Sequence, residues 1–489
     1  MHLTVDRSAG IPLYEQIARE IQRRIRNGSL PPGTRLPTVR DLARQLGVTR
    51  LTVHSAYGEL QSGGWVEATV GRGTFVAPQI GAPGELEFGR ELSARGLLGD
   101  MVRMAQVPGM RSLAMADAAP EFYPTREFGK ALEEALGSGP AALGYTVAQG
   151  DPQLRTVLAD LVAERGVSAS PDEILITAGV TQGLALLART LAQPGDVVLV
   201  EQPTYLGALN VFGNHGLRLI GVPLDSHGMI VDELEAHIVA YRPRFIYTIP
   251  AFQNPSGVCM SPERRRALLE IAGRYRVPVV EDDIYGLLAY EGPAPQALKH
   301  DDPGDLVIYV SSLSKTLLPG ARLGYIVATP NLICHLAETK QAYDLCSPAL
   351  LQRALAIFIQ HGWLASHIRR IIPRYRERRD VLLDAMARSF PSNLRWTEPL
   401  GGFCSWVMLP PDISTTDLYL AAIERGVAFA PGDVFFANAP QRPHMRLSFS
   451  SQQPDVIREA VGILGELLGT HLVRRTLTRL PANDMLPLV

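Results

Sequence analysis

The first eighty residues carry apolar side chains at helical spacing in three successive stretches. The first stretch has an apolar residue at every fourth position, namely Leu13, Ile17, Ile21 and Ile25. The second stretch follows Thr38 and stops at Gly47, and the third begins at Thr49 and stops at Gly63-Gly64. Two short β runs, Trp65-Val66 and Thr74–Val76, then flank a Gly-Arg-Gly turn.

Three helices followed by a tight hairpin are the order of a winged helix-turn-helix. We therefore predict this fold for residues 11–77. Residues 78–112 are interrupted by proline and glycine, which predicts a linker with room for a short helix over Leu97–Val107.

From about residue 120 the pattern becomes short apolar runs that alternate with helical segments. The predicted strands are Ile174–Thr177, Val197–Glu201, Phe245–Ile249, Val277–Glu281, Leu306–Ser311 and Leu323–Ala328. This alternation predicts an α/β domain over residues 113–470, with a mostly parallel sheet between two layers of helices. From about 373 to 470 a long helix and separated strands predict a smaller α+β subdomain. The chain is thus expected to be multidomain.

Composition adds a difference between the two parts. The 489 residues have a formal net charge of -2, but residues 1–80 alone carry +4 and the remainder -6, so the N-terminal part is expected to meet phosphate. The four cysteines have no paired spacing, which argues against a disulfide framework or a metal site. Without a signal peptide or a membrane-length apolar run, we expect a soluble, cytoplasmic protein with no membrane contact.

The predicted third helix presents polar side chains where a recognition helix contacts base edges. Arg50 can bind a guanine edge or a phosphate, and Thr49 and Thr52 can bond phosphate or base. Arg35 and Arg40 can bind the DNA backbone through their guanidinium groups. The alternative is a helical docking domain whose arginines are merely solvated.

Residues 11–77 also resemble the GntR-type winged helix in their motifs. The matching segments are 12–14, 32–40, 46–50, 56–57 and 71–76. The resemblance implies DNA contacts from Arg35, Thr38, Arg40, Thr49, Arg50, Thr52 and Arg72. His54-Ser55 stands where the family often has an arginine, so one phosphate contact is expected to be missing.

The larger domain contains a lysine just past a predicted strand, among phosphate-binding side chains. Hydroxyls at Ser312 and Ser314 precede Lys315, and Arg322 follows it. A phosphate needs hydroxyl donors and a forked cation, and an aldimine needs a lysine that can lose its proton. Val180 and Thr181 open a helix after a β run and add an anion site.

Four further residues follow predicted strand ends, where open α/β sheets bind ligands. Asp282 can keep a ring nitrogen protonated, Asn254 and Tyr285 can bond a phenolic oxygen, and Tyr205 can stack on a ring. Each has a plainer alternative: Tyr205 as packing, Asp282 as a helix cap and Asn254 as part of a turn.

The order of these segments resembles fold-type I aminotransferases over residues 112–470. The resemblance implies pyridoxal 5'-phosphate bound as an aldimine on Lys315, with Asp282 at the pyridine nitrogen. It further implies that Arg446, together with Asn254, binds the substrate carboxylate. Tyr145 resembles a tyrosine that reaches the phosphate of a neighbouring subunit.

The two parts together resemble the MocR family of bacterial transcriptional regulators. This resemblance implies a head-to-tail homodimer that binds double-stranded operator DNA. The large domain would sense pyridoxal phosphate, or an amine or amino acid as its external aldimine. An active aminotransferase of the 2-aminoadipate or aromatic type, and cofactor storage without sensing, are the alternatives.

Overall fold

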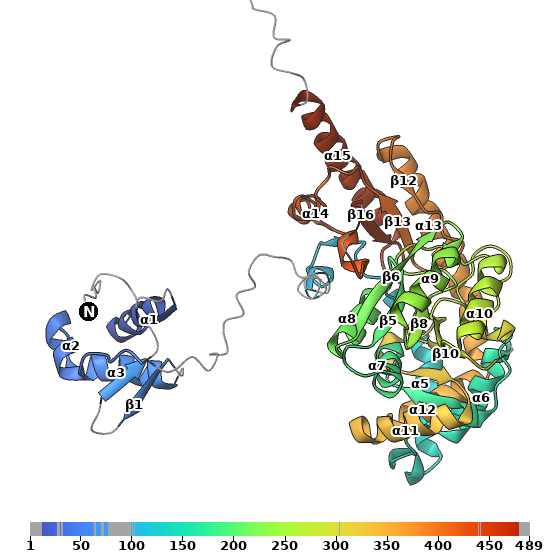
Figure 1. Ribbon diagram of the computed structural model, residues 1–489, viewed down its shortest axis with the longest axis horizontal. Coiled ribbons are helices and arrows are strands. Elements are labelled where there is room, and N and C mark those ends of the chain that lie inside the picture. Colours follow the sequence, from blue (N-terminus) through green and yellow to red (C-terminus); the bar gives the residue numbers. More distant parts are fainter. Residues whose placement is uncertain are drawn as a thin grey trace, which may run out of the picture. The chain divides into compact units, whose positions relative to one another are not determined.

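The computed structural model separates the chain into two compact units, one within residues 1–92 and one within residues 93–489 (Figure 1). It describes residues 12–26, 30, 33–62, 65–69, 73–76, 99, 101, 103–302, 304–438, 440 and 442–478. No helix among these residues is long and apolar enough to cross a membrane.

The smaller unit has the predicted order of elements. These are α1 (Leu13–Arg26), α2 (Val39–Leu46), α3 (Arg50–Ser62), β1 (Val66–Thr69) and β2 (Gly73–Val76). Thr38 caps α2 by accepting a hydrogen bond from the Asp41 backbone, and Gly47 ends the helix with φ +62°, a conformation that favours glycine. Ile17, Leu42 and Val53 come from the three helices and share one buried core.

An eight-stranded sheet forms the centre of the larger unit. Its order is β4 (Ile174–Thr177), β11 (Gly324–Val327), β10 (Val307–Ser312), β9 (Val279–Asp282), β8 (Phe245–Thr248), β5 (Val197–Gln202), β6 (Arg218–Asp225) and β7 (Gly228–Met229). Strands β10, β9, β8, β5 and β6 are parallel, whereas β11 is antiparallel to both neighbours. The six predicted strands are all present, and β6 and β7 extend the sheet beyond them.

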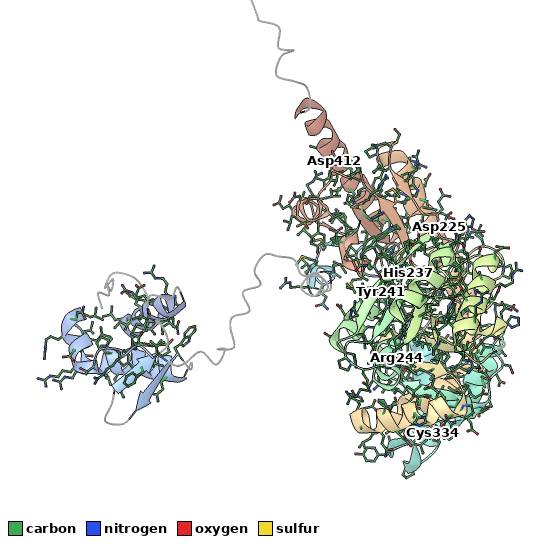
Figure 2. All side chains as sticks on the ribbon, viewed as in Figure 1. Asp225, His237, Tyr241, Arg244, Cys334 and Asp412 are labelled. Carbon is green, nitrogen blue, oxygen red and sulfur yellow. The ribbon has the colours of Figure 1, made fainter. Side chains whose placement is uncertain are left out.

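Helices cover both faces of this sheet. They are α5 (Thr125–Gly137), α6 (Pro152–Ala163), α7 (Val180–Leu191), α8 (Leu206–Asn214), α9 (Leu234–Tyr241), α10 (Pro262–Tyr275), α11 (Pro330–Asp344) and α12 (Ala349–Gln360). On β5, Val198 belongs to the core that contains α7 and α8, and Leu199 belongs to the core that contains α9 and α10. Both faces of β5 are therefore buried, which explains its continuous run of apolar residues. Asp225, labelled in Figure 2, ends β6 and pairs with Arg264 of α10 at 3.0 Å.

The C-terminal part forms the predicted α+β subdomain. A four-stranded antiparallel sheet has the order β12 (Arg395–Trp396), β13 (Cys404–Met408), β16 (His444–Ser448) and β15 (Ala430–Pro431). Its helices are α13 (Trp363–Ser389), α14 (Thr415–Glu424) and α15 (Pro454–Thr478). The long helix α13 begins before the expected boundary and continues through Pro373.

A short strand from the predicted linker joins this subdomain. Strand β3 (Arg111–Ser112) pairs in parallel with β14 (Val427–Ala428). The Leu113 backbone continues the contact, because its N–H donates to Ala428 and its carbonyl accepts from Ser448. A two-residue strand has no period to detect, which is why the sequence pattern placed it in a linker.

Candidate cofactor pocket and DNA-contacting face

A cavity of about 140 Å³ lies at the carboxyl ends of the central strands and is closed partly by the small subdomain. It collects six of the predicted site residues: Tyr205, Asn254, Asp282, Tyr285, Lys315 and Arg446. The remaining lining residues were not predicted: Met101, Met115, Ala116, Asp117, Leu206, Gly207, Ile249, Ile284 and Phe435. The side chains of these unpredicted lining residues are mostly apolar, and Asp117 is the charged residue among them.

Asp282, the last residue of β9, is buried at the wall of the cavity. Its Oδ2 accepts a hydrogen bond of 2.8 Å from the Tyr247 hydroxyl on β8. Its Oδ1 is buried and has no hydrogen-bond partner among the described residues. Burial raises the pKa of Asp282 to about 7, against the opposing effect of the Tyr247 hydrogen bond. An unsatisfied carboxylate oxygen in this position is suited to a cationic N–H donor.

Lys315 follows the end of β10, and its Nζ lies 2.9 Å from Asp117 Oδ1. Sequence reasoning identified the lysine but missed its acidic partner. The one available signal was a single acidic residue within the alanine-rich segment 114–119.

Arg446 on β16 enters the cavity from the small subdomain and is buried. Its Nη1 donates to Asn254 Oδ1 at 2.9 Å, and its Nη2 donates to the Ala114 carbonyl. The guanidinium carbon lies 4.8 Å from the centre of the Phe435 ring, while Nε is buried without a partner among the described residues. Because Asn254 uses its oxygen for Arg446, its amide N–H groups remain available to a ligand.

The predicted phosphate-binding residues gather where β4 and β10 end and β11 begins. In the sheet register Gly324 of β11 pairs with Thr177 on one side and with Ser312 on the other. Arg322 donates to the Ala178 carbonyl at 3.2 Å, and a Cβ on Gly179 would lie 2.9 Å from its Nη2. Glycine at 179, with φ +81°, therefore lets the guanidinium approach the start of α7.

These elements bring a helix N-terminus, hydroxyls and a cation together. Val180 and Thr181 begin α7, where backbone N–H groups lack helical acceptors. Ser312 and Ser314 are buried, whereas Thr181 and Arg322 are more accessible. The Tyr205 hydroxyl bonds to the Thr181 side chain, which connects this group of residues to the cavity.

Tyr145 does not line the cavity of its own chain. Its side chain is 89% exposed after the short helix η2 (Pro140–Leu143). The assignment of Tyr145 to a neighbouring subunit's phosphate stays a prediction.

In the smaller unit, the predicted DNA contacts lie at the starts of α2 and α3 and in the segments just before these helices. Arg35, Arg40, Thr49 and Arg50 are exposed, and Thr52 is half-buried. Thr49 caps α3 by accepting from the Thr52 backbone at 3.2 Å. Arg72 lies outside the described residues.

Two features near the predicted DNA contacts were not predicted. The backbone of Arg35 forms an isolated antiparallel β-bridge with Phe75 of β2. A Cβ on Gly73 would lie 3.0 Å from Arg35 Nε, so the Arg35 side chain lies close against the hairpin. Leu51 is 72% exposed on α3 beside Arg50. An exposed leucine on a recognition helix can contact a thymine methyl group.

Comparison with known proteins assigns both units. The family of bacterial regulatory proteins named gntR matches residues 13–76, and the aminotransferase class I and II family matches residues 114–464. The chain is 31% identical to the probable rhizopine catabolism regulatory protein MocR of Rhizobium meliloti, over 94% of this chain and 95% of that protein. The chain belongs to the MocR-type transcriptional regulators.

The large unit of this MocR-type regulator is also similar to solved aminotransferases. The multiple substrate aminotransferase of Thermococcus profundus is 36% identical, with a TM-score of 0.74 over 77% of this chain and 95% of that one. The α-aminoadipate aminotransferase LysN of Thermus thermophilus, complexed with N-(5'-phosphopyridoxyl)-L-leucine, is 34% identical, with a TM-score of 0.71 over 78% of this chain and all of that one. The MocR-type regulator thus has a fold-type I aminotransferase domain, and its cofactor is pyridoxal phosphate.

Proposed function

We propose that the chain binds operator DNA through its smaller unit and changes that binding when an amine or amino acid reaches the cofactor in the larger unit. The observation that carries this proposal is the presence, in one chain, of a gntR-family domain and a cavity that contains Lys315, Asp282 and Arg446. A DNA-binding unit has no evident use in a purely metabolic enzyme, whereas a ligand-binding unit is what a regulator requires.

Each chemical part of the cofactor has a matching residue. Lys315 would hold the aldehyde carbon, and Asp282 would accept the pyridine N–H on its free oxygen. The amide of Asn254 and the hydroxyl of Tyr285 would face the phenolic oxygen, and Tyr205 would stack on the ring. When bound, the cofactor supplies an aldehyde that captures amines and a ring that withdraws electrons. The phosphate would be held by Val180, Thr181, Ser312, Ser314 and Arg322.

Arg446 and Asn254 would bind the carboxylate of an amino acid. The Arg446 guanidinium is buried and partly unsatisfied, which favours an anionic ligand at this position. Because Arg446 lies on β16 and Asn254 follows β8, a ligand between them would contact the small subdomain and the central sheet together. A ligand changes DNA affinity by favouring one arrangement of these parts over another.

A homodimer would supply a second DNA-binding unit and complete the phosphate site through Tyr145. In support of an interface, exposed apolar side chains occur around α5, η2 and the end of α11: Leu136, Leu143, Tyr145, Val147, Tyr343 and Leu345. Aminotransferases of this fold are commonly dimeric, and we propose the head-to-tail arrangement for this chain. A protein that binds operator DNA must be in the same compartment as that DNA, which supports the cytoplasmic location.

An active aminotransferase is the second candidate function. It is favoured by the cavity's complete set of polar residues and by relatives such as the aromatic-amino-acid aminotransferase 1 of Thermococcus litoralis, which is 37% identical over 76% of this chain and 90% of that protein. Turnover of an amino acid with an oxo acid, measured in the absence of DNA, separates this function from sensing alone.

The test of the main proposal uses the full-length protein and the Lys315→Ala variant. The parent should absorb visible light after incubation with pyridoxal phosphate and keep the cofactor on Lys315 after borohydride reduction, as seen by peptide mass spectrometry. A screen of amines and amino acids, coupled to gel shifts on DNA upstream of its own gene, should find a compound that alters both absorbance and DNA affinity. Attachment of the reduced cofactor to another residue, or unchanged DNA binding by every compound that changes the spectrum, would refute the proposal.

A further inference from the structure

The ion pair between Lys315 and Asp117 is not explained by the roles assigned so far. Asp117 lies between β3 and η1 (Pro120–Phe122), and its Oδ1 is 2.9 Å from Lys315 Nζ. Its side chain is 47% exposed and lines the cavity, while that of Lys315 is 18% exposed. The carboxylate therefore lies at the nitrogen that would react, with one face open to an incoming ligand.

The backbone of Asp117 is held independently of its carboxylate. Ser450 donates from its hydroxyl to the Asp117 carbonyl at 2.6 Å, and Tyr123 donates to the carbonyl of Ala118. Arg446 fixes the nearby carbonyl of Ala114. These hydrogen bonds hold the segment in position without the Lys315 ion pair, so the Asp117 carboxylate is not needed to keep the segment in place.

We propose that Asp117 is a positioning residue that holds the proton on the Lys315 nitrogen while this nitrogen is joined to the cofactor. An anion beside a protonated nitrogen favours its charged form and raises its pKa. A protonated nitrogen withdraws electrons from the carbon that it is bound to, so the site would stay reactive toward amines at neutral pH. This inference rests on the proposed function, because it requires the cofactor on Lys315.

Other charged and titratable groups also surround this pair. They are Arg446 of β16, Asp282 of β9, Cys404 of β13, Tyr205, Tyr285, Tyr123 and Glu121. Burial raises the pKa of Tyr205, Tyr285 and Cys404, so these groups are neutral near pH 7. Arg446 opposes the effect of Asp117 on the nitrogen. All of these side chains are still present when Asp117 alone is replaced, so a difference between variants reports on this carboxylate.

Asp117 itself is ionised over the range that the test covers. Burial acts to raise its pKa, but Lys315, with help from Arg446, lowers it below the ordinary value. The carboxylate therefore keeps its charge from about pH 5 upward, so its own protonation does not contribute to the transition that the test follows.

The experiment follows the visible absorption band of full-length protein loaded with pyridoxal phosphate between about pH 5 and 10. In Asp117→Asn the midpoint of the spectral transition should fall by about one pH unit, the lower end of the effect of a nearby opposite charge because Asp117 is half exposed. Asp117→Glu, which keeps the carboxylate, should stay near the parent midpoint. Glu121→Gln is the matched control, because Glu121 is on the same segment but accepts from Arg378 and Gln453.

The outcomes separate this inference from the function on which it rests. Equal midpoints in the parent and Asp117→Asn, with the band present in both, would overturn the role of Asp117 and leave the proposed function intact. A parent protein without a visible band would overturn both. Asp117→Ser provides a second uncharged variant, and thermal melting verifies that each variant is folded.

Discussion

The Tyr247 hydroxyl donates to one oxygen of Asp282, and the other oxygen of this carboxylate is buried without a partner among the described residues. The two residues lie on the neighbouring strands β8 and β9. Tyr247 stabilises the charged form of Asp282, which burial disfavours. The Tyr247 hydroxyl therefore limits the rise in the pKa of Asp282 that burial causes, and a cationic donor at the second oxygen would favour the charged form further.

Tyr247→Phe should weaken cofactor binding by about 1.5–3 kcal/mol, the usual contribution of a hydrogen bond to a charged group. Titration of the apo protein with pyridoxal phosphate measures this effect. Tyr309→Phe is the matched control, because the Tyr309 hydroxyl donates to Asp283, which pairs with Arg165 rather than lining the cavity. Equal affinity losses in both variants would contradict a specific role for Tyr247.

Arg446→Ala should selectively weaken the response to ligands that carry a carboxylate. Removing a buried hydrogen-bonded cation from an anion typically costs about 2–5 kcal/mol of affinity. Spectral titrations with L-leucine and with isopentylamine, which lacks the carboxylate, form the comparison. The loss should be large for the amino acid and small for the amine, and parallel losses would remove Arg446 from the carboxylate site.

Arg50→Ala should weaken specific DNA binding by about 1–3 kcal/mol if its guanidinium contacts a base edge. Its position at the start of α3, exposed beside Thr49, supports such a contact. Footprinting on operator and unrelated DNA measures the specific component. Arg19→Ala on α1, where Arg19 pairs with Glu15, is the control and should leave specificity unchanged.

His367 on α13 should make the large unit less stable in acid. Burial and the nearby Arg370 lower the pKa of this imidazole from 6.5 to about 4. The unfolded chain binds the proton first as pH falls, so stability is lost between about pH 6.5 and 4, by at most about 3 kcal/mol. Urea unfolding at several pH values should show this slope, and His367→Gln should flatten it. A slope that persists in the variant would assign the effect to other groups.

The sequence was most informative where a residue's role shows in its immediate neighbours. Lys315 follows two serines and a β run, and Asp282 ends another, so strand-end chemistry located both. The predicted recognition helix was equally accessible, because Thr49 precedes it and Gly63-Gly64 follows it in the sequence.

Contacts between residues that are far apart in the sequence could not be predicted, because neither partner is marked by its neighbours. Asp117 and Lys315 are 198 positions apart, and Tyr247 appears as one more apolar member of a buried strand. The pairing of β3 with β14 joins residues separated by more than half of the chain. Such partners are chosen by topology, which local periodicity does not specify.

The place where the chain enters the larger unit has a mechanical consequence. Residues 111–113 are hydrogen-bonded to Gly426, Ala428 and Ser448, and Arg111 pairs with Glu459 at 2.8 Å. The polypeptide arriving from the N-terminal side is thus fastened to the same subdomain that carries Arg446. Because these hydrogen bonds join residues 111–113 to the subdomain, a tilt of that subdomain would carry this segment with it.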